Sequence, residues 1–73
     1  MVSIQPLTMM QIGETASVKQ VVGKDEARSF LLSLGFVEGG DVTVVSELGG
    51  NLIVNVKGAR VALSRVMASK IMV

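Results

Sequence analysis

The sequence predicts a small, mostly β domain: an antiparallel barrel of about five strands, with one α-helix after the first strand and a short helical turn before the last. Of its 73 residues, 49% are hydrophobic, and nearly all of these are aliphatic. The apolar residues fall in short alternating segments, and the connections are too brief to cross over between parallel strands. A small antiparallel sheet buries its inner face best by curling, which we expect to remove its exposed edges. The length allows one domain, residues 1–73.

The amino-terminal part is predicted to close one end of the core and then enter the sheet. Pro6 argues against a central strand in residues 1–13, since proline cannot donate to a sheet ladder. Three apolar residues there are expected to cover the core: Leu7, Met10 and Ile12. A half-buried strand is then predicted up to Gly23, with its inner face formed by Ala16, Val18, Gln20 and Val22.

The spacing predicts a helix over residues 24–34. Its apolar face follows the helical repeat and consists of Ala27, Phe30, Leu31 and Leu34. Asp25 and Glu26 lie at the start, where the helix dipole favours negative charge. Gly35 comes directly after the last apolar residue, where a left-handed glycine commonly ends a helix.

The second half is predicted to be a run of hairpins followed by a short helical turn. A glycine turn over 39–41 precedes a strand that starts at Val42, and the loop 47–51 connects it to a strand over 52–56. A turn at 58–59 leads into the strand 60–63. Ser64 is expected to cap one helical turn ending at Ser69, and residues 71–73 form the last strand.

The composition excludes most kinds of catalytic site. The chain has neither Cys nor His, so it can form no disulfide, no zinc-finger site and no Cys–His or Ser–His pair. Ser69 and Lys70 are adjacent, and adjacent side chains on a helix point apart. We therefore expect a binding protein that is not an enzyme and carries no cofactor.

Two carboxylates beside a glycine turn, Glu38 and Asp41, are the weak candidates for a metal site. Ca²⁺ normally takes six to eight oxygen ligands, so two carboxylates fall short of a calcium loop. Asp is also a common turn residue, which explains its position without a metal. The five methionines could offer thioether ligands to a soft metal, but core or surface packing explains them better.

Charge and hydropathy bear on the partners and the location. The formal net charge is only +1 and the basic residues are scattered, which disfavours nucleic acid as a partner. Two alternatives remain. One is a nucleic-acid surface formed by Lys57, Arg60 and Arg65, and the other is a domain that responds to a divalent metal through Glu38 and Asp41. No charged leader precedes an apolar run, and the longest apolar stretch, residues 29–37, is too short to span a bilayer. We expect a cytoplasmic protein that is not inserted in a membrane.

The order and spacing of several short motifs resemble one known family. These motifs are Leu7, Met10, Gly13 and Glu14, then residues 31–36, Gly39, 41–45, 58–64, Ala68 and 71–73. Together, from Leu7 to Val73, they resemble the FeoA family of ferrous iron transport accessory proteins. They are also similar to the SH3-like carboxyl-terminal domain of iron-dependent repressors. A chain that begins at Met1 without a helix-turn-helix is expected to be the free-standing form.

The resemblance implies an SH3-like barrel, an association with transition metal ions, and a partner, the cytoplasmic GTPase region of the transporter FeoB. Family members often carry Pro where this chain has Glu38, which changes the stiffness of a turn. They also often carry several basic residues on the helix, where this chain keeps Arg28 but has Ser29 and Ser33.

The residues predicted to contact a partner are a mixture of exposed apolar and basic side chains: Met9, Arg28, Leu48, Arg60 and Arg65. Leu48 falls at a hairpin tip, and Met9 precedes the first strand. An open strand edge would also allow two copies of the chain to pair into a homo-oligomer.

Overall fold

A computed structural model of the chain describes residues 4–73. The first residues of the predicted domain, 1–3, lie outside the described part. In chain order the elements are η1 (Leu7–Met9), β1 (Thr15–Ser17), β2 (Gln20–Val21), α1 (Asp25–Ser33), β3 (Asp41–Leu48), β4 (Asn51–Val56), β5 (Ala59–Ser64), α2 (Arg65–Ala68) and β6 (Ile71–Met72). The predicted order of strands and helices is confirmed, with six strands instead of about five.

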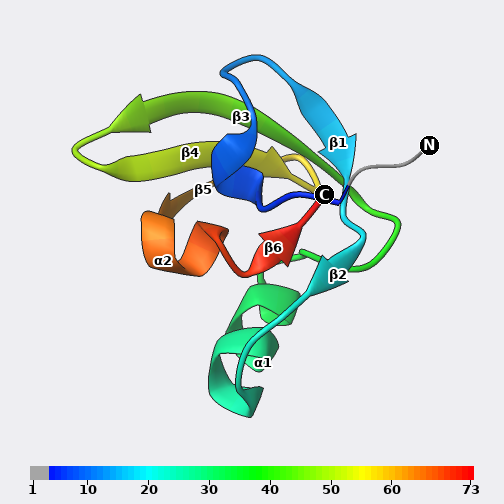
Figure 1. The fold of residues 1–73 in the computed structure, drawn as a ribbon. Helices are drawn as coiled ribbons and strands as arrows, with labels where there is room; N and C mark the ends of the chain where they lie inside the picture. Colours follow the sequence, from blue (N-terminus) through cyan, green and yellow to red (C-terminus); the bar gives the residue numbers. More distant parts are fainter. Residues whose placement is uncertain (1–3) are drawn as a thin grey trace.

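The strands form two antiparallel sheets (Figure 1). One has four strands in the order β1-β3-β4-β5, and the other pairs β2 with β6. The amino-terminal segment adds to the free side of β6, because Gln5 and Val73 exchange two backbone hydrogen bonds of 3.0 and 2.8 Å. The chain therefore folds into an antiparallel β-structure, as predicted, and the two ends of the described chain lie side by side.

Two-residue turns connect the long strands. Gly49 and Gly50 have φ angles of 59° and 82°, and Lys57 and Gly58 have φ angles of 50° and 78°. Two successive positive φ values are typical of a type I′ turn, whose twist matches that of the strands. The loops are tighter than predicted: β3 continues to Leu48, and the second turn lies at residues 57–58, one residue earlier than expected.

The predicted continuous strand from Ala16 to Val22 is wrong. The chain leaves the large sheet after β1 and joins the small one at β2. The N–H of Val18 donates to the carbonyl of Gly40, while that of Lys19 donates to Met72. The alternation of buried and exposed side chains shifts by one residue where the chain crosses between the sheets. Val21 is therefore buried, whereas Gln20 and Val22 are exposed.

Helix α1 ends as predicted, but its apolar face is narrower. The N–H of Gly35 donates to the Leu32 carbonyl and that of Phe36 to the Leu31 carbonyl, which together form a Schellman motif. Leu31 and Phe36 are fully buried. Phe30, predicted on the buried face, is 51% exposed, because α1 packs on the core mainly along the side that carries Leu31.

A second apolar prediction also fails at the amino terminus. Leu7 and Met10 are buried as expected, but Ile12 is 63% exposed. It lies in a turn that is fixed on both sides, because the Gln11 N–H donates to the Glu14 carboxylate and the Gly13 N–H donates to the Val44 carbonyl. These bonds direct the Ile12 side chain outward.

A single apolar core, aliphatic except for Phe36, joins the two sheets and both helices. Its buried residues are Leu7, Met10, Val18, Val21, Leu31, Phe36, Val42, Val44, Leu52, Val54, Val56, Leu63, Ala68, Ile71 and Val73. Strand β4 contributes every second residue, the alternation expected for a strand with one buried face. Helix α2 starts where predicted, because the Ser64 hydroxyl accepts a hydrogen bond of 3.2 Å from the Met67 N–H.

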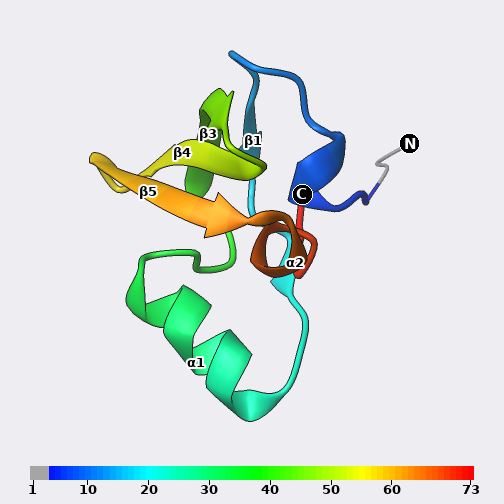
Figure 2. The same cartoon turned by 90° about the vertical axis from the view of Figure 1, so that its left-hand side faces the viewer.

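The curled sheet keeps one long exposed edge, which corrects the expectation that curling removes exposed edges. Strand β5 is the last strand of the four-stranded sheet and pairs with β4 alone among the described strands. Figure 2 shows β5 at the margin of the sheet, with α2 continuing from its end.

Candidate interaction site

A polar row crosses the outer face of the four-stranded sheet. The strand register places Thr15, Thr43, Asn55 and Arg60 opposite one another on β1, β3, β4 and β5. The hydroxyl oxygens of Thr15 and Thr43 lie 2.8 Å apart, within hydrogen-bonding distance. Because successive side chains of a strand point to opposite faces, the buried valines of β3 and β4 place these polar residues outside the core.

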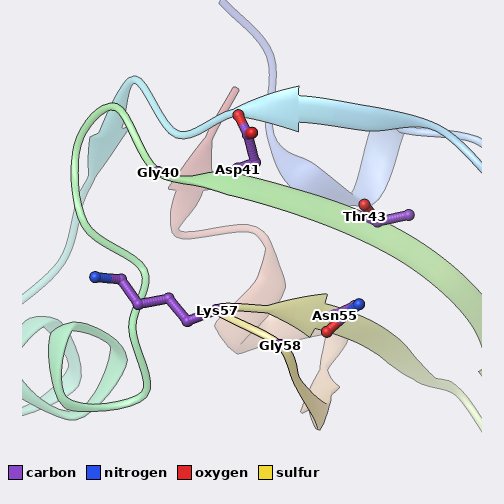
Figure 3. A pocket seen from close by; sticks show the side chains of 6 residues that line it. All are labelled: Gly40, Asp41, Thr43, Asn55, Lys57 and Gly58. Carbon is purple, nitrogen blue, oxygen red and sulfur yellow. The ribbon is translucent and has the colours of Figure 1, made fainter.

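A shallow depression with a volume of about 360 Å³ lies beside the middle of this row, next to Thr43 and Asn55. Gly40, Asp41, Thr43, Asn55, Lys57 and Gly58 line it (Figure 3). The Ser17 hydroxyl donates to the Asp41 carboxylate at 3.4 Å. Lys57 extends away from Asp41, and its side chain passes Gly35. The depression therefore offers hydroxyl, amide and carboxylate groups that could hydrogen-bond a polar ligand.

A second exposed region lies where β3, β4 and α2 meet. Leu48, the last residue of β3, is 72% exposed. The residue before it, Glu47, forms an ion pair with Arg65, the first residue of α2. Val66 on α2 is also exposed, as is Met9 on η1, which packs beside α2. We call Met9, Leu48 and Val66 the hairpin-end residues.

The five predicted contact residues do not form one cluster. Met9, Leu48 and Arg65 lie on the elements around α2, whereas Arg28 lies on α1 and Arg60 near the other end of β5. All five are exposed. Sequence reasoning missed Val66, whose position directly after a capping serine and a charged residue was a usable sign of exposure.

The metal candidates do not fit a resident metal ion. Glu38 and Asp41 are both exposed, and Asp41 already accepts a hydrogen bond from Ser17. Within residues 4–73, no three Asp or Glu side chains come together as a possible ligand set. Two exposed carboxylates leave most positions around a divalent cation to water.

The three cations proposed for nucleic acid do not converge either. Lys57 is the first residue of the turn between β4 and β5, and its side chain passes Gly35. Arg60 is the second residue of β5, and Arg65 is five residues beyond Arg60. That separation corresponds to about 16 Å of extended strand. Arg65 is also engaged by Glu47, so it contributes less positive charge to this surface.

Comparison with known proteins identifies the family. The model of the FeoA domain matches residues 5–73. The chain belongs to the FeoA domain family. It is also 34% identical over 68 residues to the "Putative Fe(2+) transport protein A" of Methanocaldococcus jannaschii, an alignment that covers 93% of this chain and 83% of that protein. The resemblance seen in the sequence is thus confirmed, and the family connects this FeoA-domain chain with Fe²⁺ transport.

Solved structures show the same SH3-like fold. The FeoA of Stenotrophomonas maltophilia, described as a prokaryotic SH3 domain protein and solved with zinc, superposes with a TM-score of 0.81 at 30% identity. That match covers 92% of this chain and 86% of the other. A manganese-dependent transcriptional repressor gives a TM-score of 0.86 at 22% identity, covering 96% of this chain and 40% of the repressor. The repressor likeness, also anticipated from the sequence, concerns the fold.

Membrane insertion through a helix finds no support in the described part of this FeoA-domain chain. Across residues 4–73, no helix has both the length and the apolar character needed to cross a bilayer.

Proposed function

We propose that this FeoA-domain protein is a non-enzymatic accessory factor of ferrous iron uptake that acts by direct contact with the cytoplasmic GTPase region of a FeoB-type transporter. Family membership across residues 5–73 is the observation that carries the proposal. In this role Fe²⁺ is the cargo of the transporter, and the accessory protein needs no metal site of its own.

The distribution of exposed apolar side chains supports a role in binding another protein. Leu48 and Val66 are aliphatic residues that lie largely in solvent on well-packed elements, and Phe30 is half exposed on α1. Single exposed apolar residues are common, but apolar anchors surrounded by polar groups are typical of protein interfaces. The ion pair between Glu47 and Arg65 lies beside Leu48 and would belong to the polar rim.

The test is a binding measurement between the purified protein and the cytoplasmic region of the ferrous iron transporter from the same organism, with and without guanine nucleotides. Uptake of labelled Fe²⁺ is measured in parallel in a strain that lacks the protein. We expect saturable binding, and uptake that falls in the deletion strain and recovers on complementation. Normal uptake together with no binding would refute the proposal.

Surface variants connect the two measurements. Leu48→Ser and Val66→Ser remove exposed apolar groups, and Ile4→Ser is the matched control at an exposed isoleucine outside the hairpin end. Each should fold normally, because exposed substitutions usually change stability by no more than about 0.5 kcal/mol. A hairpin-end contact predicts weaker binding for the first two variants and unchanged binding for the control.

A further inference from the structure

The backbone of β5 has a free hydrogen-bonding edge. In the β4–β5 hairpin, the two-residue turn pairs Val56 with Ala59, and the register then continues without a bulge to Ser64. Along an antiparallel pair, residues whose backbone groups bond to the neighbouring strand alternate with residues whose backbone groups point away from it. Counted from the turn, the N–H and C=O groups of Val61 therefore point toward β4. Those of Arg60 and Ala62 point away from β4, and within residues 4–73 no other backbone hydrogen bond reaches them.

This edge has only one of the features that usually protect an exposed strand, a charged residue. Natural sheets blunt their edges with charged side chains, proline, bulges or very short strands. Strand β5 has six residues, no proline and no bulge, and Arg60 is its one charged residue. The opposite edge strand, β1, has three residues. Arg60 and Ala62 are both exposed, so a further strand can reach this edge.

The inner side of β5 is also incompletely covered. Its inward-facing residues become less buried toward the turn at the start of the strand: Leu63 is buried, Val61 is half-buried and Ala59 is exposed. An added antiparallel strand would pair with Arg60 and Ala62 and would place the residue between these partners opposite Val61. An aliphatic side chain at that position would complete the cover over Val61.

The charge around the edge selects the chemistry of the added strand. Arg60 lies on β5 itself and Lys57 is the first residue of the turn that precedes β5, and in residues 4–73 neither forms an ion pair. Of the acidic residues nearby, Glu47 is engaged by Arg65, and Asp41 lies on β3, two strands away. A second copy of β5 would bring no negative charge to this edge, because Arg60 is the one charged residue of the strand. Opposite charges across a strand pair attract, so the edge favours an acidic segment.

We propose that the β5 edge binds an extended acidic segment of a partner protein by β-strand addition, with a carboxylate opposite Arg60 and an aliphatic residue opposite Val61. Main-chain hydrogen bonds supply affinity in this mode, and alternate side chains supply specificity. The inference rests on the proposed function in one respect: the segment is expected in the cytoplasmic region of the transporter.

The test follows amide hydrogen exchange of the whole protein by NMR with two probes. One is the transporter's cytoplasmic region, and the other is a synthetic peptide, Ser-Thr-Val-Glu-Val-Asp-Ser. The peptide Ser-Thr-Val-Lys-Val-Lys-Ser is the matched control of opposite charge. Strand addition should slow exchange of the Arg60 and Ala62 amides about tenfold or more, since these amides face solvent in the free protein. The Val61 amide, already bonded to β4, should change little.

Two variants separate backbone pairing from charge. Ala62→Pro removes a donor that faces away from β4, a position where an edge strand tolerates proline. Arg60→Glu keeps the backbone edge but reverses its charge, so it is informative even if the proline variant does not fold. Each should weaken binding of the acidic peptide about tenfold, the scale of one lost hydrogen bond or one repulsive pair. Lys19→Glu, an equal charge change at an exposed residue outside β5, should leave binding intact.

The outcomes distinguish this inference from the proposed function. If the transporter region binds while the Arg60 and Ala62 amides exchange as before, the edge is not the binding site and the proposed function stands. If the acidic peptide protects both amides but the transporter region does not bind, the edge site stands and the proposed partner is wrong. Protection by neither probe overturns the inference. So does protection that grows with protein concentration alone, because the occupant would then be a second copy.

Discussion

The N–H of Phe36 donates a hydrogen bond of 3.2 Å to the carbonyl of Leu31, and both side chains are fully buried. This pairing reverses the chain at the end of α1 and directs it into the large sheet. It depends on Gly35, whose φ of 107° is unfavourable for any residue with a side chain.

Gly35→Ala should therefore destabilise the protein by about 1–2 kcal/mol or more, measured by urea unfolding. An added Cβ would also lie 3.2 Å from the Cγ of Lys57. Gly13→Ala is the matched control, because Gly13 has a φ of 93° but nothing within 4 Å of the added atom. An effect at Gly35 no larger than that at Gly13 would show that the approach of Lys57 costs nothing.

Ser64→Ala should lower the free energy of unfolding by about 1 kcal/mol, because the Met67 N–H loses its acceptor at the start of α2. Ser64→Asp retains an acceptor oxygen and should recover most of the loss. Thermal or urea unfolding measures the free energy of unfolding of both variants relative to the unchanged protein. No loss in Ser64→Ala would mean that the cap contributes little and that packing of Ala68 holds α2 in place.

The same chemical change should have different effects at two isoleucines. Ile71→Val removes one methylene from a fully buried side chain on β6 and should cost about 0.5–1.5 kcal/mol. Ile12→Val removes it from a side chain in solvent, and the change should stay within about 0.5 kcal/mol. Both effects are measured as shifts of the midpoint of urea unfolding, in variants whose free energy of unfolding depends on urea with the same slope. A comparable cost at Ile12 would contradict its exposed position.

The ion pair between Glu47 and Arg65 should contribute little to stability, because their side chains are 42% and 53% exposed. A double-mutant cycle with Glu47→Gln and Arg65→Gln should give a coupling energy of about 0.2–1 kcal/mol that decreases as salt is added. A coupling that is larger, or insensitive to salt, would indicate a pair shielded from solvent. The cycle also provides variants with intact folds for the binding experiments.

Local signals in the sequence located the elements well. Gly35 after an apolar repeat, Ser64 before a helical turn and the double glycine at 49–50 each require a particular backbone geometry, so neighbouring residues were enough to identify them. The order of these short motifs also identified the family, because it is the spacing between turns and core positions that family members share.

The errors occurred where distant parts of the chain decide the outcome. Phe30 and Ile12 are as apolar as their buried neighbours, and only the positions of the sheet and the fixed turn leave them in solvent. The break after β1 arises because Lys19 pairs with Met72, more than fifty residues away in the chain. The free edge of β5 likewise depends on which strands become neighbours, and alternation within one strand carries no information about that.

The two hydrogen bonds between Gln5 and Val73 have a consequence for how this fold can be rearranged. They bring the ends of the described chain together, so the backbone is almost a closed ring. A short linker should join the ends, and new termini could then be opened at Gly49 and Gly50, whose turn makes no core contact. The same geometry means that a domain attached at either end would emerge at one place, and the rest of the barrel surface would stay free for binding.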